Sequence, residues 1–255
     1  MPRVSFEVTA DAYDGFMGRF SRLLSPQMAD LAGVRAGRNV LDVGCGTGAL
    51  TRELVDRLGA DRVTAVDPSE SFVAAAHERF PGVRIERAAA EALPFDEDRF
   101  DIVIAQLVVH FMNDPVDGIR EMRRVTRPGG VVAACVWDYG GGANPLSLFW
   151  NAARDLDADT PGEADLPGTR EGHLVELFRE AELADIEGSV VTADLEMRSF
   201  DEYWEPFNGG VGPAGVYLRQ LSEGDRDRVR ARARERAGRE PFTVVARAWA
   251  ARGTP

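Results

Sequence analysis

Short apolar runs alternate with amphipathic stretches through the first half of the chain. Apolar runs of four to eight residues bounded by turn signals predict buried strands. They lie at Asn39–Val43, Arg62–Val66, Val83–Arg87, Phe100–Leu107 and Val131–Trp137. The stretches between them have helical spacing and run over Ala49–Leu58, Glu70–Arg79 and Pro115 to about Val125. Strands that alternate with helices are typical of a parallel doubly wound sheet, so the pattern predicts an α/β fold.

The N-terminal region has a different pattern. Tyr13, Phe16, Met17 and Phe20 repeat at helical spacing, and a second short helix is expected from Pro26 to about Leu31. We therefore expect residues 1–36 to form a helical cap on a core that covers residues 37–138.

The pattern loosens after Trp137. We expect helices at Leu146–Leu156 and Glu171–Leu183, a linker at Asp157–Gly168 and a strand at Val190–Leu195. An aromatic segment with glycines follows, and it holds Tyr203, Trp204, Phe207 and Tyr217. These rings are expected either to form a lid over a substrate pocket or to be the core of their own subdomain. Residues 139–240 would thus complete the core and add the lid, and residues 241–255 would supply a last strand over Phe242–Ala250.

Composition narrows the function classes. The chain has 255 residues, 44% of them apolar, with a formal net charge of −12. This acidic balance disfavours a nucleic-acid partner. The alternating arginines of Arg226–Arg239 are expected to lie on a solvated surface helix rather than on an anion-binding face. No apolar run is long enough for a membrane span, and Met1–Ala10 does not have the pattern of a secretory signal.

The cysteine and histidine counts add two expectations. Cys45 and Cys135 are the only cysteines, which suggests a reducing cytoplasm without a disulfide framework. The three histidines are scattered, so no metal site is expected.

The most informative chemistry lies in the nine residues Val40–Gly48. A predicted strand runs into a turn with Gly44, Gly46 and Gly48, and a helix follows whose free N–H groups face the gap. Such turns bind nucleotide-type cofactors at the carboxyl ends of strands. The G-x-G-x-G spacing differs from the dinucleotide pattern G-x-G-x-x-G. Asp42 precedes the turn, and Asp67 ends the next strand at the distance expected of a ribose-binding acid.

These residues resemble the first motif of the class I S-adenosylmethionine (SAM)-dependent methyltransferases. Further matching segments are similar to the ubiquinone/menaquinone-biosynthesis-type branch, and together they cover about half of the chain. They are Tyr13–Arg19, Val63–Asp67, Ala90–Phe95, Phe100–Val103, Leu107–His110 and Arg123–Gly130. The resemblance implies a Rossmann-like, seven-stranded, mostly parallel sheet with an antiparallel last strand, helices on both faces and a small lid insertion. It also implies SAM as cofactor, with S-adenosylhomocysteine (SAH) as product, and small-molecule acceptors.

The resemblance carries a set of cofactor-binding residues onto this chain. The glycines would line the methionine and ribose portion, and Asp67 would accept both ribose hydroxyls. One departure is Ala89, where many relatives carry an acid for the adenine amino group, so backbone groups or Glu91 would replace it. The full set is Tyr13, Arg19, Asp42, Gly44, Cys45, Gly46, Gly48, Asp67, Pro68, Ser69, Ala90, Glu91, Gln106 and Leu107.

The acceptor side offers fewer signals. His110 follows the fourth strand and is the candidate catalytic base, although a packing role against the cofactor is the alternative. Tyr13 and Arg19 are candidates to close over the cofactor, and packing of Tyr13 on the core is the alternative. Trp204, Phe207 and Tyr217 are candidates to shape the acceptor pocket, and a role as the core of their own subdomain is the alternative. The sequence thus predicts methyl transfer to a small molecule. The alternatives are a non-catalytic SAM-binding protein and, with less support from the glycine spacing, an NAD(P)-dependent oxidoreductase.

Overall fold

A seven-stranded sheet forms the centre of the molecule. The computed structural model describes residues 13–160, 162–210 and 212–255, so the prediction for Met1–Ala10 lies outside the described residues. The strands follow the order β3-β2-β1-β4-β5-β9-β6. Strands β1 to β5 are parallel, and β9 is antiparallel to both β5 and β6. Their bounds are β1 Val40–Val43, β2 Val63–Asp67, β3 Arg84–Arg87, β4 Phe100–Gln106, β5 Thr126–Trp137, β6 Ala184–Thr192 and β9 Arg247–Thr254. This architecture confirms the predicted fold class.

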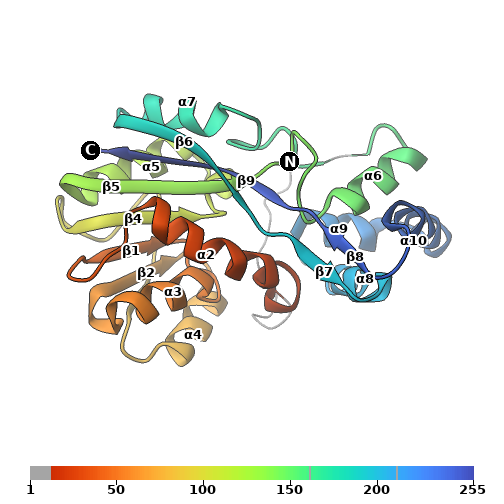
Figure 1. Cartoon of the computed structure of the whole chain (residues 1–255), viewed down its shortest axis with the longest axis horizontal. Coiled ribbons are helices and arrows are strands. Elements are labelled where there is room, and N and C mark those ends of the chain that lie inside the picture. The colour runs from red at the N-terminus through yellow and green to blue at the C-terminus, as the bar shows by residue number, and fades with distance from the viewer. Residues whose placement is uncertain (1–12, 161, 211) are drawn as a thin grey trace.

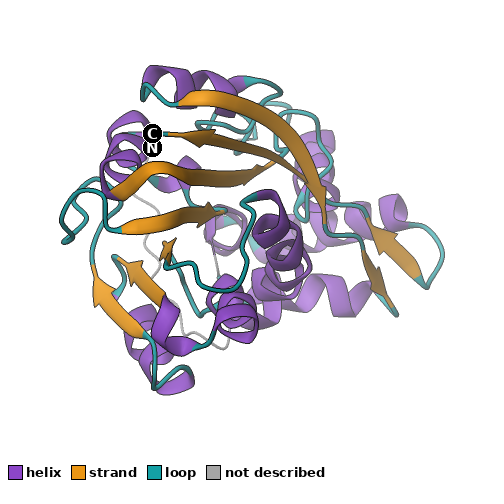
Figure 2. Cartoon of the chain, turned by 60° about the vertical axis from the view of Figure 1, so that its left-hand side comes forward, coloured by secondary structure: helices purple, strands orange, loops and turns teal. Residues whose placement is uncertain are grey.

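Helices cover both faces of this twisted sheet (Figure 2). Alternate residues of a strand point to opposite faces. Val40 and Ile102 accordingly join one apolar cluster with α2 (Arg19–Leu31), α3 (Ala49–Leu58) and α4 (Glu70–Arg79). Leu41 and Val103 join a second cluster with α5 (Pro115–Val125) and α7 (His173–Glu180). Burial on both faces explains why the central strands are continuous apolar runs.

The N-terminal region forms one continuous helix, so the prediction of a separate helix that begins at Pro26 was wrong. A short π-helical segment, η1 (Asp14–Gly18), runs directly into α2, and Pro26 lies inside α2. An interior proline costs about 3 kcal/mol because it removes one helix hydrogen bond. The buried side chains of Phe20, Leu24 and Met28 compensate for this cost by anchoring α2 to the sheet.

The predicted last strand, Phe242–Ala250, is in fact two strands. Its first part is β8 (Phe242–Val244), which pairs with β7 (Leu195–Met197) in a small separate sheet. Its second part belongs to β9 in the main sheet. Figure 1 shows that β7 and β8 continue the line of β6 and β9 away from the main sheet. Strand β6 begins earlier than predicted. The sequence did not indicate its first residues as a strand, because most residues of β6 are exposed and lack an apolar pattern.

Four helices gather at the end of the molecule that β7 and β8 reach (Figure 1). We call them the helical subdomain: α6 Ser147–Leu156, α8 Phe200–Asn208, α9 Gly212–Gln220 and α10 Glu223–Ala237. Its interior is aromatic, with the rings of Phe149 and Phe207 stacked at 4.8 Å. Trp204 and Phe207 are buried there, so these aromatics form the core of the subdomain, the second of the two options that the sequence left open. Phe16 of η1 packs on Phe207 and joins the subdomain to the cap.

The arginine-rich segment is a surface helix, as predicted. On α10, Arg232 and Arg236 pair with Asp155 of α6, and Arg230 and Arg234 pair with Asp201 of α8. These ion pairs give the arginines a structural role within the subdomain. Two short 3-10 helices, η2 (Ala60–Arg62) and η3 (Val109–Phe111), complete the elements. No helix in the described ranges is both long and apolar enough to cross a bilayer.

Candidate functional site

The glycine turn lies at the carboxyl end of β1. The amide of Gly44 donates to the carbonyl of Val66 on β2, at 2.8 Å, which ties the turn to the neighbouring strand. Gly44, Gly46 and Gly48 have φ values of 71°, 54° and 92°, in the left-handed region that favours glycine. We call residues 44–48 the donor turn.

The three glycines of the donor turn face different surroundings. A Cβ atom on Gly44 would lie 2.4 Å from the side chain of Val108, and one on Gly48 would lie 2.2 Å from the ring of Phe80. These two glycines are therefore required for packing inside the protein. A Cβ atom on Gly46 would meet nothing within 4 Å. Gly46 is thus the position at which the missing side chain leaves the backbone open to a ligand.

Asp67 stands beside Gly46 at the end of β2. One carboxylate oxygen accepts the amide of Gly46 at 2.9 Å, and the other accepts the amide of Ser69 at 2.8 Å. The side chain is 6% exposed, and burial raises the pKa of this carboxyl above its usual value. Each carboxylate oxygen has a further lone pair, so Asp67 can still accept two hydroxyl groups. Ser69 caps α4, and the exposed Pro68 lies between Asp67 and Ser69.

Asp42 and Cys45 are buried in the protein. Asp42 is 1% exposed, and its carboxyl accepts a 2.6 Å hydrogen bond from the hydroxyl of Thr51 on α3. Burial raises the pKa of Asp42 to about 7. Burial also raises the pKa of the Cys45 thiol well above its usual value, which makes it a poor nucleophile. The Asp42–Thr51 pair holds the start of α3 against β1 and was not foreseen.

Several other predicted cofactor residues have protein partners. One carboxylate oxygen of Glu91 accepts the amides of Asn113, at 2.6 Å, and Asp114. Glu91 thus orders the loop before α5, which disfavours it as the replacement for the missing acid at Ala89. Ala90 is buried beside it. Gln106 donates to α2, at the carbonyl of Ser21 and the hydroxyl of Ser25. Arg19 is paired with Glu202 of α8 at 2.7 Å and is not among the residues that line the pocket described below.

An unpredicted ionic contact attaches the N-terminal helix to the donor turn. The carboxylate of Asp14 bonds both to the hydroxyl of Thr47 and to the guanidinium of Arg79 on α4. Arg79 also donates to the carbonyl of Thr47 at 3.0 Å. These contacts hold η1 beside the donor turn and so position Tyr13, whose ring packs against Phe72 of α4 at 5.4 Å.

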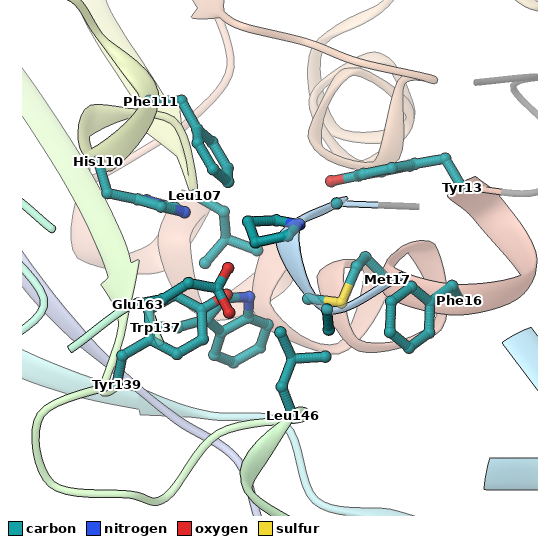
Figure 3. A pocket seen from close by; sticks show the side chains of 13 residues that line it. Tyr13, Phe16, Met17, Leu107, His110, Phe111, Trp137, Tyr139, Leu146 and Glu163 are labelled. Atoms are coloured by element: carbon teal, nitrogen blue, oxygen red, sulfur yellow. The ribbon is translucent and has the colours of Figure 1, made fainter. Parts of the chain in front are cut away.

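A pocket lies between the sheet, η1 and the helical subdomain (Figure 3). Its empty space, open mouth included, is about 420 Å³. We call it the aromatic pocket, and its described lining residues are Tyr13, Phe16, Met17, Leu107, His110, Phe111, Trp137, Tyr139, Leu146, Glu163, Gly212, Pro213 and Ala214. Tyr13 and Leu107 are thus the only two residues of the predicted cofactor set that line it. Leu107 has a φ of 64°, unusual for a residue with a side chain and typical of functional sites.

His110 is a buried polar group of the aromatic pocket. Its side chain is 4% exposed, and within the described part of the chain neither ring nitrogen has a hydrogen-bond partner. The rings of Phe111 and Tyr139 pack against it at 3.8 Å and 5.9 Å. Burial lowers the pKa of His110 to about 3. The imidazole is therefore neutral at physiological pH and better suited to hydrogen bonding than to accepting a proton.

Glu163 is the second buried polar group, and the sequence analysis missed it. It lies in Asp157–Gly168, which was expected to be a linker, yet its side chain is only 3% exposed. Its carboxylate accepts a 2.7 Å hydrogen bond from the indole of Trp150, and the nearby hydroxyl of Tyr139 also favours its charged form. Burial raises the pKa of Glu163 to about 7. No local pattern marks this acid, because its burial depends on rings from distant segments.

Comparisons with known proteins bear on the region that carries the donor turn. Residues 41–134 match the family model described as "Methyltransferase domain". The malonyl-[acyl-carrier protein] O-methyltransferase of Halorhodospira halophila is 34% identical over 51% of this chain and 45% of that protein. The ubiquinone/menaquinone biosynthesis C-methyltransferase UbiE of Idiomarina loihiensis is 33% identical over 59% of this chain and 62% of that protein. The chain thus spans about half the length of these curated relatives.

Solved structures share the fold. The putative methyltransferase of Haloferax volcanii, in its complex with the Trm112 activator, matches 98% of this chain and all of that chain with a TM-score of 0.61 and 19% identity. A Haemonchus contortus phosphoethanolamine N-methyltransferase bound to SAM matches 97% of this chain and 57% of that chain with a TM-score of 0.60 and 17% identity. The expected resemblance is confirmed: residues 41–134 match a methyltransferase domain and are similar to ubiquinone/menaquinone biosynthesis C-methyltransferases.

Proposed function

We propose that this chain transfers the methyl group of SAM to a small-molecule acceptor. The observation that carries the proposal is the pairing of Gly46, which has open space at its Cα, with the Asp67 carboxylate 2.9 Å from its amide. Backbone without a side chain admits the donor, and a carboxylate beside it suits two ribose hydroxyls. The methyltransferase domain of the same residues supports SAM as the methyl donor.

The aromatic pocket supports the acceptor side of this proposal. Tyr13 and Leu107, two residues expected at the donor, also line this pocket. SAM supplies an electrophilic methyl group, so the protein has mainly to hold a nucleophile in line with the departing sulfur and to exclude water. The apolar rings of Phe16, Phe111 and Trp137 provide a dry enclosure for this purpose. We propose that neutral His110 forms a hydrogen bond to the acceptor rather than acting as its base.

The proposal extends to the setting of the reaction. We propose a cytoplasmic enzyme, because Cys45 and Cys135 are both free and buried in the protein. The helical subdomain packs against the rest of the chain and leaves only a confined pocket, which favours small acceptors over macromolecules.

A single-turnover assay tests the proposal. The protein is mixed with methyl-labelled SAM and a panel of small amines, alcohols and carbon acids, and SAH and labelled product are measured. We expect SAH to form with at least one acceptor. Tight SAM binding without any turnover would instead identify a non-catalytic SAM-binding protein. Absence of SAM binding together with an absorbance change of bound NADH would identify an oxidoreductase.

A further inference from the structure

We infer that Glu163 recognises the acceptor, and that the acceptor is a small apolar amine that enters the aromatic pocket as a cation. The inference rests on the proposed function and names the substrate class for it. It is carried by a buried carboxyl group that faces an apolar, ring-lined pocket, and none of the described lining residues carries a fixed positive charge.

The position of Glu163 is the first observation. The residue lines the pocket, and Figure 3 shows its carboxyl oxygens directed toward the middle of the labelled side chains. The hydrogen bond from Trp150 orients the carboxyl group and leaves lone pairs free. A carboxyl so deeply buried is costly unless it is paired, hydrogen-bonded or neutral. A ligand that brings a positive charge would complete its pairing.

The charge of the lining is the second observation. None of the described lining residues is lysine or arginine, and His110 is neutral. The charged group that acts on Glu163 from α6 is Arg154, which partly offsets the effect of burial on the glutamate pKa. An anionic acceptor would meet Glu163 without compensation inside the pocket. A cationic acceptor would be attracted by the Glu163 carboxylate.

The aromatic rings are the third observation. Tyr13, Phe16, Phe111, Trp137 and Tyr139 all contribute to the lining. Ring faces attract cations that lie within about 6 Å of the ring centre. A carboxylate surrounded by rings therefore suits an ammonium group attached to an apolar body, and the rings would pack against that body.

The same carboxylate gives the amine a route to its reactive form. An ammonium group has no lone pair, so it must lose a proton before it can attack the methyl group. The Glu163 carboxylate accepts that proton and becomes a carboxylic acid. The neutral amine then forms the N–C bond as the S–C bond breaks, which yields SAH and a methylated ammonium product. Glu163 afterwards returns its proton to water. A pKa of about 7 suits this transfer at neutral pH.

Calorimetric titration of the SAH-loaded protein tests the inference with three probes of similar size. They are 2-phenylethylamine, 2-phenylethanol and phenylacetate. We expect the amine to bind about tenfold or more tightly than the alcohol, and phenylacetate to bind most weakly. Glu163→Gln should weaken amine binding about tenfold or more and change alcohol binding about twofold or less. Asp165→Asn, which removes an exposed charge two residues away, should leave all three affinities unchanged.

A measurement on the unaltered protein complements the variants. Because Glu163 gains its charge as pH rises through about 7, affinity for 2-phenylethylamine should increase between pH 5 and pH 8. The same readout does not depend on whether Glu163→Gln folds normally.

The contrary results are distinct from failure of the proposed function. Phenylacetate binding as tight as amine binding, or amine affinity that is the same in Glu163→Gln and independent of pH, would overturn the inference while SAH binding stays intact. Loss of SAM affinity relative to SAH affinity in Glu163→Gln would assign the carboxylate to the donor sulfonium and also overturn it. Absence of SAH binding by the unaltered protein would refute the proposed function itself, and the inference with it.

Discussion

The donor turn and the aromatic pocket are the two halves of the proposed site, and they are built differently. The donor side combines the backbone of the donor turn with the carboxylate of Asp67, so its key residues lie close together in the sequence. The aromatic pocket is lined by residues from six separate stretches of the chain between Tyr13 and Ala214. Backbone geometry suits a donor that is always the same molecule. Side chains from several segments, some of them outside the matched residues 41–134, suit an acceptor that differs from one enzyme to the next.

The largest expected effect is a loss of SAH affinity when a side chain is added in the donor turn but not when one is added at a glycine elsewhere. Gly46→Val fills the open space at the turn and should weaken SAH binding more than about 100-fold, or ~3 kcal/mol. Gly33→Val is the matched control, because Gly33 also has a positive φ and open space around it. Both variants should lose some thermal stability, but calorimetry should show that Gly33→Val binds SAH normally. Equal affinity of the two variants for SAH would place the ligand away from Gly46.

A smaller loss of SAH affinity is expected when the carboxylate beside the donor turn, that of Asp67, is changed. Asp67→Asn retains one acceptor oxygen but loses the charge, so SAH affinity should fall about 10- to 100-fold. Affinity for the amine probe should stay within about threefold when SAH is saturating, since Asp67 does not line the aromatic pocket. Unchanged SAH affinity by calorimetry would contradict the assignment of Asp67 to the ribose.

The buried Asp42 should make stability depend on pH. Its pKa is about 7 in the folded protein, whereas the pKa of an unperturbed aspartate is 3.8. At pH values between these two, the folded state therefore binds more protons than the unfolded state. Asp42 therefore contributes stability that is present below about pH 4 and is lost as pH rises through 7. In Asp42→Asn, the change in the free energy of unfolding between low and high pH should be smaller by on the order of 1–3 kcal/mol. Urea unfolding at pH 5 and pH 8 measures it, and an identical pH dependence in both proteins would contradict the burial of a titrating Asp42.

A modest effect is expected for His110. His110→Ala removes one hydrogen-bonding group from the aromatic pocket, so kcat/KM for the acceptor should fall about tenfold. The affinity for SAM should change less than about twofold. His77→Ala, on the exposed side of α4, is the control and should change neither quantity. Equal losses of turnover and SAM affinity would instead assign His110 to the donor side.

The smallest effect concerns the surface of the helical subdomain. Asp155→Asn breaks the ion pairs with Arg232 and Arg236, which are solvent-exposed and therefore weak. A slight fall in the thermal unfolding midpoint is expected at low salt, and it should vanish at high salt. Binding of SAH and of the amine probe should not change. A loss of acceptor binding would show that the subdomain surface, and not only its interior, controls the pocket.

The contrast between the two regions also explains what the sequence could predict. The donor turn, Asp67 and the central strands follow local rules of glycine spacing and apolar runs, and the structure has these elements where they were expected. Glu163 follows no local rule, because Trp150 and Tyr139 bury it only after the chain has folded. Pro26 and β6 show the same limit. Burial of α2 overrides the proline, and the polar sequence of an edge strand conceals β6.

Crystallography of the protein with SAH tests the central claim most directly. The account predicts SAH in the crevice at the donor turn, with both ribose hydroxyls within hydrogen-bonding distance of the Asp67 carboxylate and the sulfur directed at the aromatic pocket. SAH bound elsewhere on the protein, or a ribose without contact to Asp67 while the crevice binds a pyrophosphate compound, would contradict it.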